Sequence, residues 1–448
     1  MSELDRRNFL KTAAASATLL GPASVATGTT PRLSKISHQR ATKKAAMSRG
    51  GFSQARLDGM HEVLNGYIER KEIPGMVALV SRRGEVHCDA LGATAFGGSI
   101  PVQRDTIFRI ASMSKPVTAA ATMILVEACK LRLDDPVDRL LPELANRKVL
   151  KRPDGPLDDT VPAKRPITVR DLLTFRLGWG IVMAPPGTYP IQQAMDKLQL
   201  GQGPPSPALM PAPEEWMRRL GTLPLMYQPG ERWMYNTGAD VLSVLVARAS
   251  GQPFEAFLRE RIFEPLGMKD TGFHVPAEKL SRFTTSYWTG FGSRNLEIYD
   301  QAKGGQWSRP PAFPSGAGGM VSTADDYLAF GQMMLNRGTY GKQRILSRPS
   351  VELMTSDQLT TREKAVSGLV TGYFENHGWG FCMSVVTGRE DFRSIGTFGW
   401  DGGLGTSWYS DPREELAAVL LTQRAWTSPN PPDVCLDFWT SAYQAIDD

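Results

Sequence analysis

Segments with the pattern of β-strands lie near both ends of this sequence, whereas helical periodicity dominates its middle. Residues 76–81 and 85–90 form a predicted β-hairpin around Arg82-Arg83-Gly84. Short apolar segments with strand character return much later, at residues 380–386, 394–399, 406–410 and 417–423. Strands from both ends can share one sheet when the middle of the chain forms an insertion. The sequence therefore predicts an α+β fold: an antiparallel sheet formed from both chain ends, flanked by helices, with an inserted, mostly helical lobe.

The predicted helices are placed by apolar spacing and by capping residues. Residues 53–70 carry apolar side chains at helical spacing behind Ser53, a natural N-cap. Residues 239–250 are apolar nearly all round and end at Gly251, which predicts a buried helix. Thr168 to Asp171 has the form of a capping box. Further helices are predicted at residues 112–129, 323–335 and 433–445.

A segment rich in proline and methionine interrupts the helical region. Residues 185–229 contain ten of the 32 prolines, together with Met195, Met210, Met217 and Met226. Its apolar side chains need a surface to pack on, so we expect a lid-like insertion rather than a linker.

The first fifty residues have the composition of a targeting segment. Arg6 and Arg7 precede a weakly apolar stretch and small residues up to Ala26, which resembles a twin-arginine export signal. A disordered basic tail is the alternative interpretation. We expect residues 1–26 to be the signal peptide, residues 27–51 a disordered basic linker and residues 52–448 the folded domain. The expected location is periplasmic or secreted.

The charge of the folded part argues against nucleic-acid binding. The chain has 51 basic and 46 acidic residues, of which nine and two respectively lie in the first 50 positions. The remainder holds 42 basic and 44 acidic residues, a net charge of −2. A nearly neutral domain does not attract the negatively charged phosphate backbone of a nucleic acid. No later segment offers about 18 uncharged apolar residues, so we expect no stable membrane insertion.

Cysteine and histidine give no sign of a cofactor or metal. The four cysteines lie far apart, and we expect buried small side chains rather than disulfides. The five histidines show no metal-ligand spacing, and the sequence contains neither a Walker loop nor a dinucleotide-binding GxGxxG motif, so neither a metal nor a cofactor is expected.

Ser112-Met113-Ser114-Lys115 stands where a short apolar segment leads into the predicted helix 112–129. A helix places residues three apart on one face, so the Ser112 hydroxyl and the Lys115 amine become neighbours. The helix N-terminus favours negative charge on an attacking oxygen, and a desolvated lysine can take the serine proton. Ser112 is the only serine with a lysine three residues later. A capping serine beside a solvated lysine is the alternative.

Two further segments can contribute to the same chemistry. Tyr235-Asn236-Thr237-Gly238 places a tyrosine in a turn before a buried helix, where its phenol can act as base or acid. Beside a lysine, we expect its phenolate to be accessible near neutral pH. Trp400-Asp401-Gly402-Gly403 lies between two strands, where backbone N–H groups can bind an oxyanion. A packed aromatic side chain and a glycine-rich hairpin are the respective alternatives.

Together and in this order, the three segments resemble the motifs of the penicillin-recognising serine hydrolases. The nearest likeness is to class C β-lactamases, DD-peptidases and family VIII carboxylesterases. It runs from about residue 52 to 445 and includes residues 167–174 and Leu266-Gly267-Met268. The resemblance implies a serine β-lactamase/DD-peptidase-like fold, acylation of Ser112 and proton transfer by Lys115 and Tyr235. It also implies an oxyanion hole made by the backbone N–H groups of Ser112 and Gly403.

Two departures from the family pattern narrow the expected chemistry. The pattern Tyr-x-Asn becomes Tyr235-Asn236-Thr237, which replaces the amide that holds an acylamido side chain. The pattern Lys-Thr-Gly becomes Trp400-Asp401-Gly402, which removes a positive charge that helps to bind a substrate carboxylate. Both changes favour uncharged esters. The predicted substrate-binding residues are Asn236, Thr237, Trp400, Asp401 and Gly402, and we expect Trp216 to help Trp400 form an apolar pocket.

We therefore expect a serine hydrolase that acts through an acyl-enzyme on Ser112, most simply a carboxylesterase for small to medium uncharged esters. The expected partner is a small-molecule ester or amide. An amidase, peptidase, acyltransferase, β-lactamase or DD-peptidase on the same machinery is an alternative. A catalytically silent binding protein with this fold is another.

Overall fold

The computed structural model describes residues 49–448 except residues 186, 202 and 290–294. The predicted signal peptide and nearly all of the predicted linker lie outside these residues. No helix in the described part of the chain has the length and apolar character needed to cross a bilayer.

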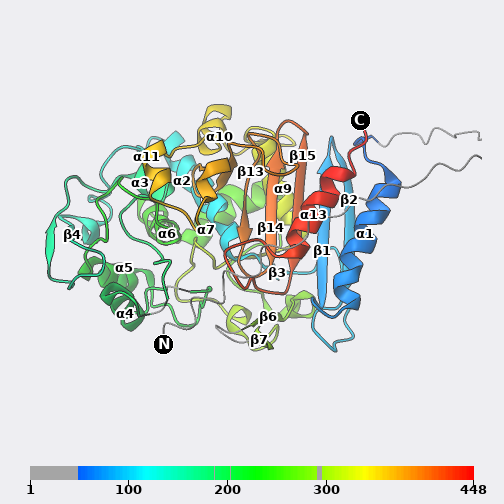
Figure 1. The fold of residues 1–448 in the computed structure, drawn as a ribbon, viewed down its shortest axis with the longest axis horizontal. Coiled ribbons are helices and arrows are strands. Elements are labelled where there is room, and N and C mark those ends of the chain that lie inside the picture. Colours follow the sequence, from blue (N-terminus) through cyan, green and yellow to red (C-terminus); the bar gives the residue numbers. More distant parts are fainter. Residues whose placement is uncertain (1–48, 186, 202, 290–294) are drawn as a thin grey trace, which may run out of the picture. The chain divides into compact units, whose positions relative to one another are not determined.

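One antiparallel sheet of seven strands joins the two ends of the domain, as the sequence predicts (Figure 1). In spatial order its strands are β11 (His377–Trp379), β12 (Ser384–Val386), β13 (Phe398–Gly402), β14 (Thr406–Asp411), β15 (Leu416–Thr422), β1 (Gly75–Arg82) and β2 (Glu85–Gly92). The N-terminal hairpin joins the C-terminal strands through β1 and β15, where Val77 lies opposite Leu421. The predicted α+β fold is therefore confirmed.

The sheet is covered on both faces. All eight residues of β1 are buried, and they alternate between two hydrophobic clusters: Val77 and Leu79 face one, Ala78 and Val80 the other. On the second face α1 (Gln54–Glu69) packs beside α13 (Asp433–Gln444), visible as the blue and red helices of Figure 1. On the first face α9 (Ala324–Leu335) packs against the central strands. Each fully buried Val or Leu side chain contributes about 1.5–3 kcal/mol, so both faces anchor the sheet.

The helical lobe is built around two buried helices. α2 (Ser114–Glu127) packs against α6 (Thr237–Ser250), which ends at Gly251 in the left-handed conformation. The other helices are α3 (Val169–Leu173), α4 (Pro190–Lys197), α5 (Pro213–Thr222), α7 (Phe254–Leu258), α8 (Glu264–Leu266), α10 (Arg348–Met354), α11 (Thr361–Ala365) and α12 (Tyr373–Asn376). The short strands outside the main sheet pair two by two: β3 (Phe108–Arg109) with β8 (Val321–Ser322), β4 (Lys148–Leu150) with β5 (Thr160–Pro162), β6 (Ser286–Thr289) with β7 (Leu296–Asp300), and β9 (Thr339–Tyr340) with β10 (Gln343–Arg344).

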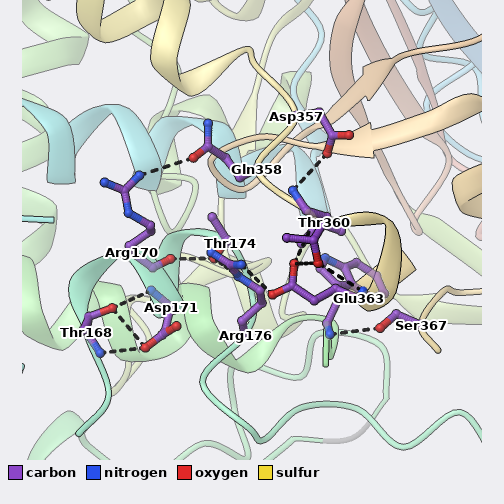
Figure 2. A network of polar contacts seen from close by, with 12 residues as sticks. Thr168, Arg170, Asp171, Thr174, Arg176, Asp357, Gln358, Thr360, Glu363 and Ser367 are labelled. Atoms are coloured by element: carbon purple, nitrogen blue, oxygen red, sulfur yellow. Dashed lines mark hydrogen bonds and ion pairs between the residues drawn. The ribbon is translucent and has the colours of Figure 1, made fainter. Parts of the chain in front are cut away.

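Polar side chains hold α11 against the segment around α3 (Figure 2). The Arg176 guanidinium pairs with the Glu363 carboxylate at 2.6 Å, and both side chains are nearly buried. Thr168 and Asp171 form the predicted capping box at the start of α3. Thr360 and Glu363 form a second box at the start of α11, which leaves Glu363 one oxygen for Arg176.

Several predicted boundaries are wrong. The predicted strand 380–386 is instead a turn followed by β12, and Cys382 has a φ of 58° within that turn. The predicted strand 394–399 begins only at Phe398, because Gly396 has a φ of 95° and Thr397 closes a turn onto Ser394. An apolar run of this length does not reveal where the chain reverses.

Two predictions about buried side chains also need correction. Cys382 and Cys435 are buried, but Cys88 is half-buried and Cys129 is exposed, and all four are free thiols. The segment 185–229 contains α4 and α5, and Trp216 packs in the core, with its ring 5.3 Å from that of Phe313. Trp216 therefore does not line a substrate pocket, because an amphipathic helix turns it inward.

Candidate active site

Ser112 lies in a single turn of 3₁₀-helix, Ala111–Met113, immediately before α2 rather than within it. Ala111 has a φ of 44°, a left-handed conformation that is costly for any residue with a Cβ. Ser114 holds this turn: its hydroxyl donates to the Ala111 carbonyl at 2.7 Å and accepts from the Met320 N–H at 3.2 Å. The strained turn places Ser112 half-buried on the wall of a large cavity.

Lys115 is completely buried next to Ser112. Its Nζ donates to the Ser112 Oγ at 2.9 Å and to the Ala317 carbonyl at 2.5 Å. Burial lowers the pKa of the Lys115 amine, and the nearby Asp240 carboxylate opposes this shift only in part. A lysine with a lowered pKa is available in its neutral form, which can accept the Ser112 proton.

Tyr235 connects Ser112 to the third motif. Its hydroxyl accepts the Trp400 Nε1–H at 2.7 Å and also hydrogen-bonds with the Ser112 side chain. The indole can only donate, so the phenol oxygen is the acceptor on that side, and the bond with Ser112 likewise lowers the pKa of Tyr235. Burial raises the pKa of Tyr235 well above its usual value, although the bonds with Ser112 and Trp400 oppose this. The expected phenolate near neutral pH is therefore wrong, and the geometry suits a neutral phenol that acts as an acid.

A strained turn presents Tyr235 to the cavity. Asn236 has φ 86° and ψ −65°, and the Thr237 N–H reaches back to the Tyr235 carbonyl at 3.3 Å. This is the rare γ-turn with positive φ, which persists only where the surrounding structure enforces it. The turn ends as α6 begins, so the helix fixes the direction in which the phenol points.

The predicted oxyanion groups, the N–H of Ser112 and the N–H of Gly403, belong to residues of the same cavity wall. Neither N–H donates a hydrogen bond to another of the described residues. A Cβ at Gly403 would meet nothing within 4 Å, so no neighbouring group packs against the side-chain position of this residue. Both amides are therefore available to an oxygen that gains negative charge.

The five predicted substrate-binding residues do not all reach the cavity. Asn236, Trp400 and Asp401 line it. Thr237 is only 1% exposed because it lies inside the first turn of α6. Gly402 is buried where β13 crosses the residue before the 3₁₀ turn, and a Cβ there would lie 2.3 Å from the Ile110 carbonyl oxygen. Thr237 and Gly402 thus position the site and do not touch its contents.

The cavity has a volume of about 1070 Å³ and an apolar side formed by Met183, Leu209 and Met210. Asp401 also lines the cavity, and its carboxylate accepts hydrogen bonds from Ser407 and Tyr409. The size and the apolar wall suit a ligand larger than a few atoms.

Asp240 is a further site residue that the sequence analysis missed. It lies in α6, is 4% exposed and accepts a hydrogen bond from the Ser315 hydroxyl at 2.6 Å. Burial raises the pKa of this carboxyl, and the charge of Lys115 opposes that shift. The available signal was an acid within an otherwise apolar helix, which is costly to bury without a partner. Across the described residues, no group of three or more His, Cys, Asp or Glu side chains has the arrangement of a metal site.

Comparison with known proteins identifies the family of this chain. The β-lactamase family model matches residues 60–433. Protein Rv1367c of Mycobacterium tuberculosis is 38% identical over 85% of this chain and 92% of its own length. Esterase EstB of Burkholderia gladioli is 31% identical over 84% of this chain and 92% of its own length.

A solved structure shows the same fold. EstCE1, described as a hydrolase with promiscuous acyltransferase activity, superposes with a TM-score of 0.69 at 25% identity and covers 88% of this chain and 99% of that one. The chain therefore belongs to the β-lactamase family, and the resemblance seen in its three motifs is confirmed. Within that family it is a serine hydrolase.

Proposed function

We propose that this protein is a carboxylesterase that forms an acyl-enzyme on Ser112 and acts on esters with a small to medium, uncharged acyl group. The observation that carries the proposal is the continuous hydrogen-bond chain from Trp400 through Tyr235 to Ser112 and Lys115. The neutral indole of Trp400 occupies the position where the family pattern has a lysine, so no cation at this position attracts a substrate carboxylate. The esterase name of EstB and the hydrolase description of EstCE1 support the same reaction class.

The reaction begins when the Ser112 Oγ attacks the ester carbonyl and its proton passes to neutral Lys115, 2.9 Å away. The carbonyl oxygen becomes an oxyanion, which the N–H groups of Ser112 and Gly403 stabilise. When the C–O bond breaks, the leaving alkoxide takes the Tyr235 proton, and the Lys115 ammonium restores the proton to Tyr235. Water then attacks the acyl-enzyme by the same steps in reverse order, releasing the acid and free Ser112.

The first test compares wild type with Ser112→Ala on p-nitrophenyl butyrate and on a chromogenic cephalosporin. We expect rapid cleavage of the ester, negligible cleavage of the cephalosporin and loss of ester cleavage in the variant. A fluorophosphonate probe should label wild type and not Ser112→Ala. Efficient cephalosporin turnover would contradict the role given to Trp400, and labelling of the variant would refute Ser112 as the nucleophile.

Acyl transfer is a second candidate because EstCE1 is described with promiscuous acyltransferase activity. An alcohol replaces water as the acceptor of the same acyl group. Adding methanol to a p-nitrophenyl butyrate reaction and measuring methyl butyrate separates the two outcomes. If the ratio of butyrate to p-nitrophenol stays constant as methanol is added, transfer of the butyryl group to methanol is excluded.

We also propose that residues 1–26 direct twin-arginine export and that the protein works in the periplasm or outside the cell. The supporting features are the Arg6-Arg7 pair and the short apolar stretch that follows it. Replacing both arginines with lysine should retain the precursor in the cytoplasm, as measured by cell fractionation. Unchanged export of this variant would refute the proposal.

A further inference from the structure

A second cavity, of about 880 Å³, borders the active-site cavity. The two share wall residues, namely Ile181, Met183, Tyr235 and residues 369–372. Tyr235 is the group that gives its proton to the departing alcohol in the proposed mechanism. The alcohol part of an ester therefore lies on the side of Tyr235, from which it can extend toward the second cavity.

One wall of the second cavity is fixed by the contacts of Figure 2. α11 contributes Thr361, Lys364 and Ala365 to the wall and is tied to the α3 segment by the Arg176–Glu363 pair. Directly after it, the Ser367 hydroxyl accepts the Trp233 N–H at 3.1 Å. This wall is therefore preorganised before any ligand binds.

Arg232 also lines the second cavity, three residues before Tyr235 in the sequence. Its guanidinium stacks on the Tyr227 ring with its carbon 4.4 Å from the ring centroid, and its Nη1 donates to the Tyr227 hydroxyl at 2.9 Å. Both contacts described for this guanidinium are with Tyr227, and neither is with a carboxylate. The other charges of the lining are Lys364, which pairs with Asp357, and the exposed Glu375.

A guanidinium held in this way has the chemistry of a carboxylate receptor. Its remaining N–H groups form a planar fork that binds both oxygens of a carboxylate, and the stacked ring reduces the entropy lost on binding. Arg232 is half-buried, so a carboxylate bound here is also partly shielded from water.

We propose that the second cavity binds the alcohol part of the substrate and that Arg232 recognises a carboxylate at its far end. The ligand class is an ester of a hydroxy acid, with a neutral acyl group at Ser112 and a free carboxylate on the alcohol side. This inference rests on the proposed esterase function. The family pattern has a lysine at position 400, and this chain has Trp400 there. The loss of that charge affects the active-site cavity, which Trp400 lines, whereas Arg232 lines the second cavity.

The test uses two butyrate esters that differ only in charge: the ester of 6-hydroxyhexanoic acid and the ester of 6-hydroxyhexanamide. We expect wild type to show a kcat/KM about tenfold or more higher for the acid, as for one charge-assisted hydrogen-bonded pair. In Arg232→Gln this ratio should fall to about one, and Arg232→Lys should retain part of it. Because the ratio is taken within each variant, it does not depend on the amount of active enzyme.

Arg344→Gln is the matched control, because it removes the same charge from an exposed position outside both cavities. Its ratio should equal that of wild type. A second pair, methyl hydrogen adipate and methyl adipamate, places the carboxylate on the acyl side and should show no preference for the acid.

The wild-type protein alone provides another measurement, since 6-hydroxyhexanoate should inhibit more strongly than 6-hydroxyhexanamide. Equal rates for the two butyrate esters, or a preference that survives in Arg232→Gln, would overturn the role of Arg232 and leave the esterase proposal intact. If the protein cleaves none of the three esters, namely the two butyrate esters and p-nitrophenyl butyrate, the esterase function itself is overturned.

Discussion

Trp400 acts at the residue scale through a single N–H. In Trp400→Phe the aromatic packing remains but Tyr235 loses the donor that favours its ionisation, so Tyr235 becomes a weaker acid. We expect kcat to fall roughly tenfold to a hundredfold, the cost of one buried hydrogen bond to a reacting group. The loss should be larger for ethyl butyrate than for p-nitrophenyl butyrate, because a poor leaving group depends more on the acid.

Trp379→Phe is the control for this prediction. Trp379 is buried in the same aromatic cluster, with its ring 6.4 Å from that of Tyr235, but its own Nε1 has no partner among the described residues. The variant should therefore keep the wild-type ratio of the two rates. Equal losses for both esters in Trp400→Phe would show that the indole only supports packing.

The pH dependence of activity depends on Lys115. Lys115 must be neutral to act as a base, so kcat/KM falls as the pH drops below the pKa of Lys115. Because burial lowers this pKa, the acidic limb of the pH profile of kcat/KM lies below the range of an ordinary lysine. The Asp240 carboxylate raises the pKa of Lys115, so Asp240→Asn should move the limb to lower pH. Asp326→Asn, a buried acid of α9, should leave the limb in place. A shift to higher pH in Asp240→Asn would contradict this assignment.

The sequence predicted which residues form this site better than it predicted their protonation and backbone conformation. Ser112 and Lys115 are neighbours because residues three apart share one face of a helical turn, whereas the approach of Tyr235 and Gly403 was expected only from the family resemblance. The protonation of Tyr235 was predicted wrongly, since burial depends on residues distant in the sequence. The strain at Ala111 was not predicted for the same reason.

At the scale of elements, the contact between β13 and the turn that carries Ser112 requires a residue without a Cβ. Such an atom at Gly402 would lie 2.1 Å from the Thr406 Oγ1 and 2.3 Å from the Ile110 carbonyl oxygen. Gly402→Ala should therefore cost about 1–3 kcal/mol or more of the free energy of unfolding, measured by denaturant titration. Gly403→Ala is the neighbouring control and should unfold like wild type, because its Cβ enters open space. Equal stability of the two variants would contradict the close approach.

Element types were predictable from periodicity, but element ends were not. The helices at both chain ends and the hairpin of β1 and β2 follow from apolar spacing and from Arg83-Gly84 at the turn. The predicted strand 380–386 joined β12 to the turn before it and missed β11, because residues 381–383 of that turn are buried and apolar like a strand. The 185–229 segment has helices inside a proline-rich composition, with Pro190 and Pro213 at their first positions.

At the scale of the whole domain, the pairing of β1 with β15 was predictable in kind because strands at both ends need partners. The polar contacts that close the same junction were not predictable. Arg82 is 2% exposed and donates to the Gly50 and Glu414 carbonyl oxygens, both at 2.8 Å, and to the Asp448 carboxylate at 2.6 Å. One buried guanidinium thus joins three segments that are distant in the sequence.

Arg82→Met should therefore lower the thermal midpoint, since the buried Gly50 carbonyl oxygen loses its donor at a cost of about 1–3 kcal/mol and the half-buried Glu414 carbonyl oxygen loses its donor at a smaller cost. Arg83→Met is the control, because Arg83 is 40% exposed and its ion pairs with Glu415 and Asp448 are surface contacts. Arg82 and Arg83 hold the pKa of Asp448 below its usual value, so the contribution of this carboxylate is complete above the ordinary carboxyl pKa and is lost as the pH falls through the lowered one. The difference between wild type and Arg82→Met should narrow in acid, as measured by melting curves across that range. A difference that stays constant with pH would assign the effect of Arg82 to the two carbonyl oxygens alone.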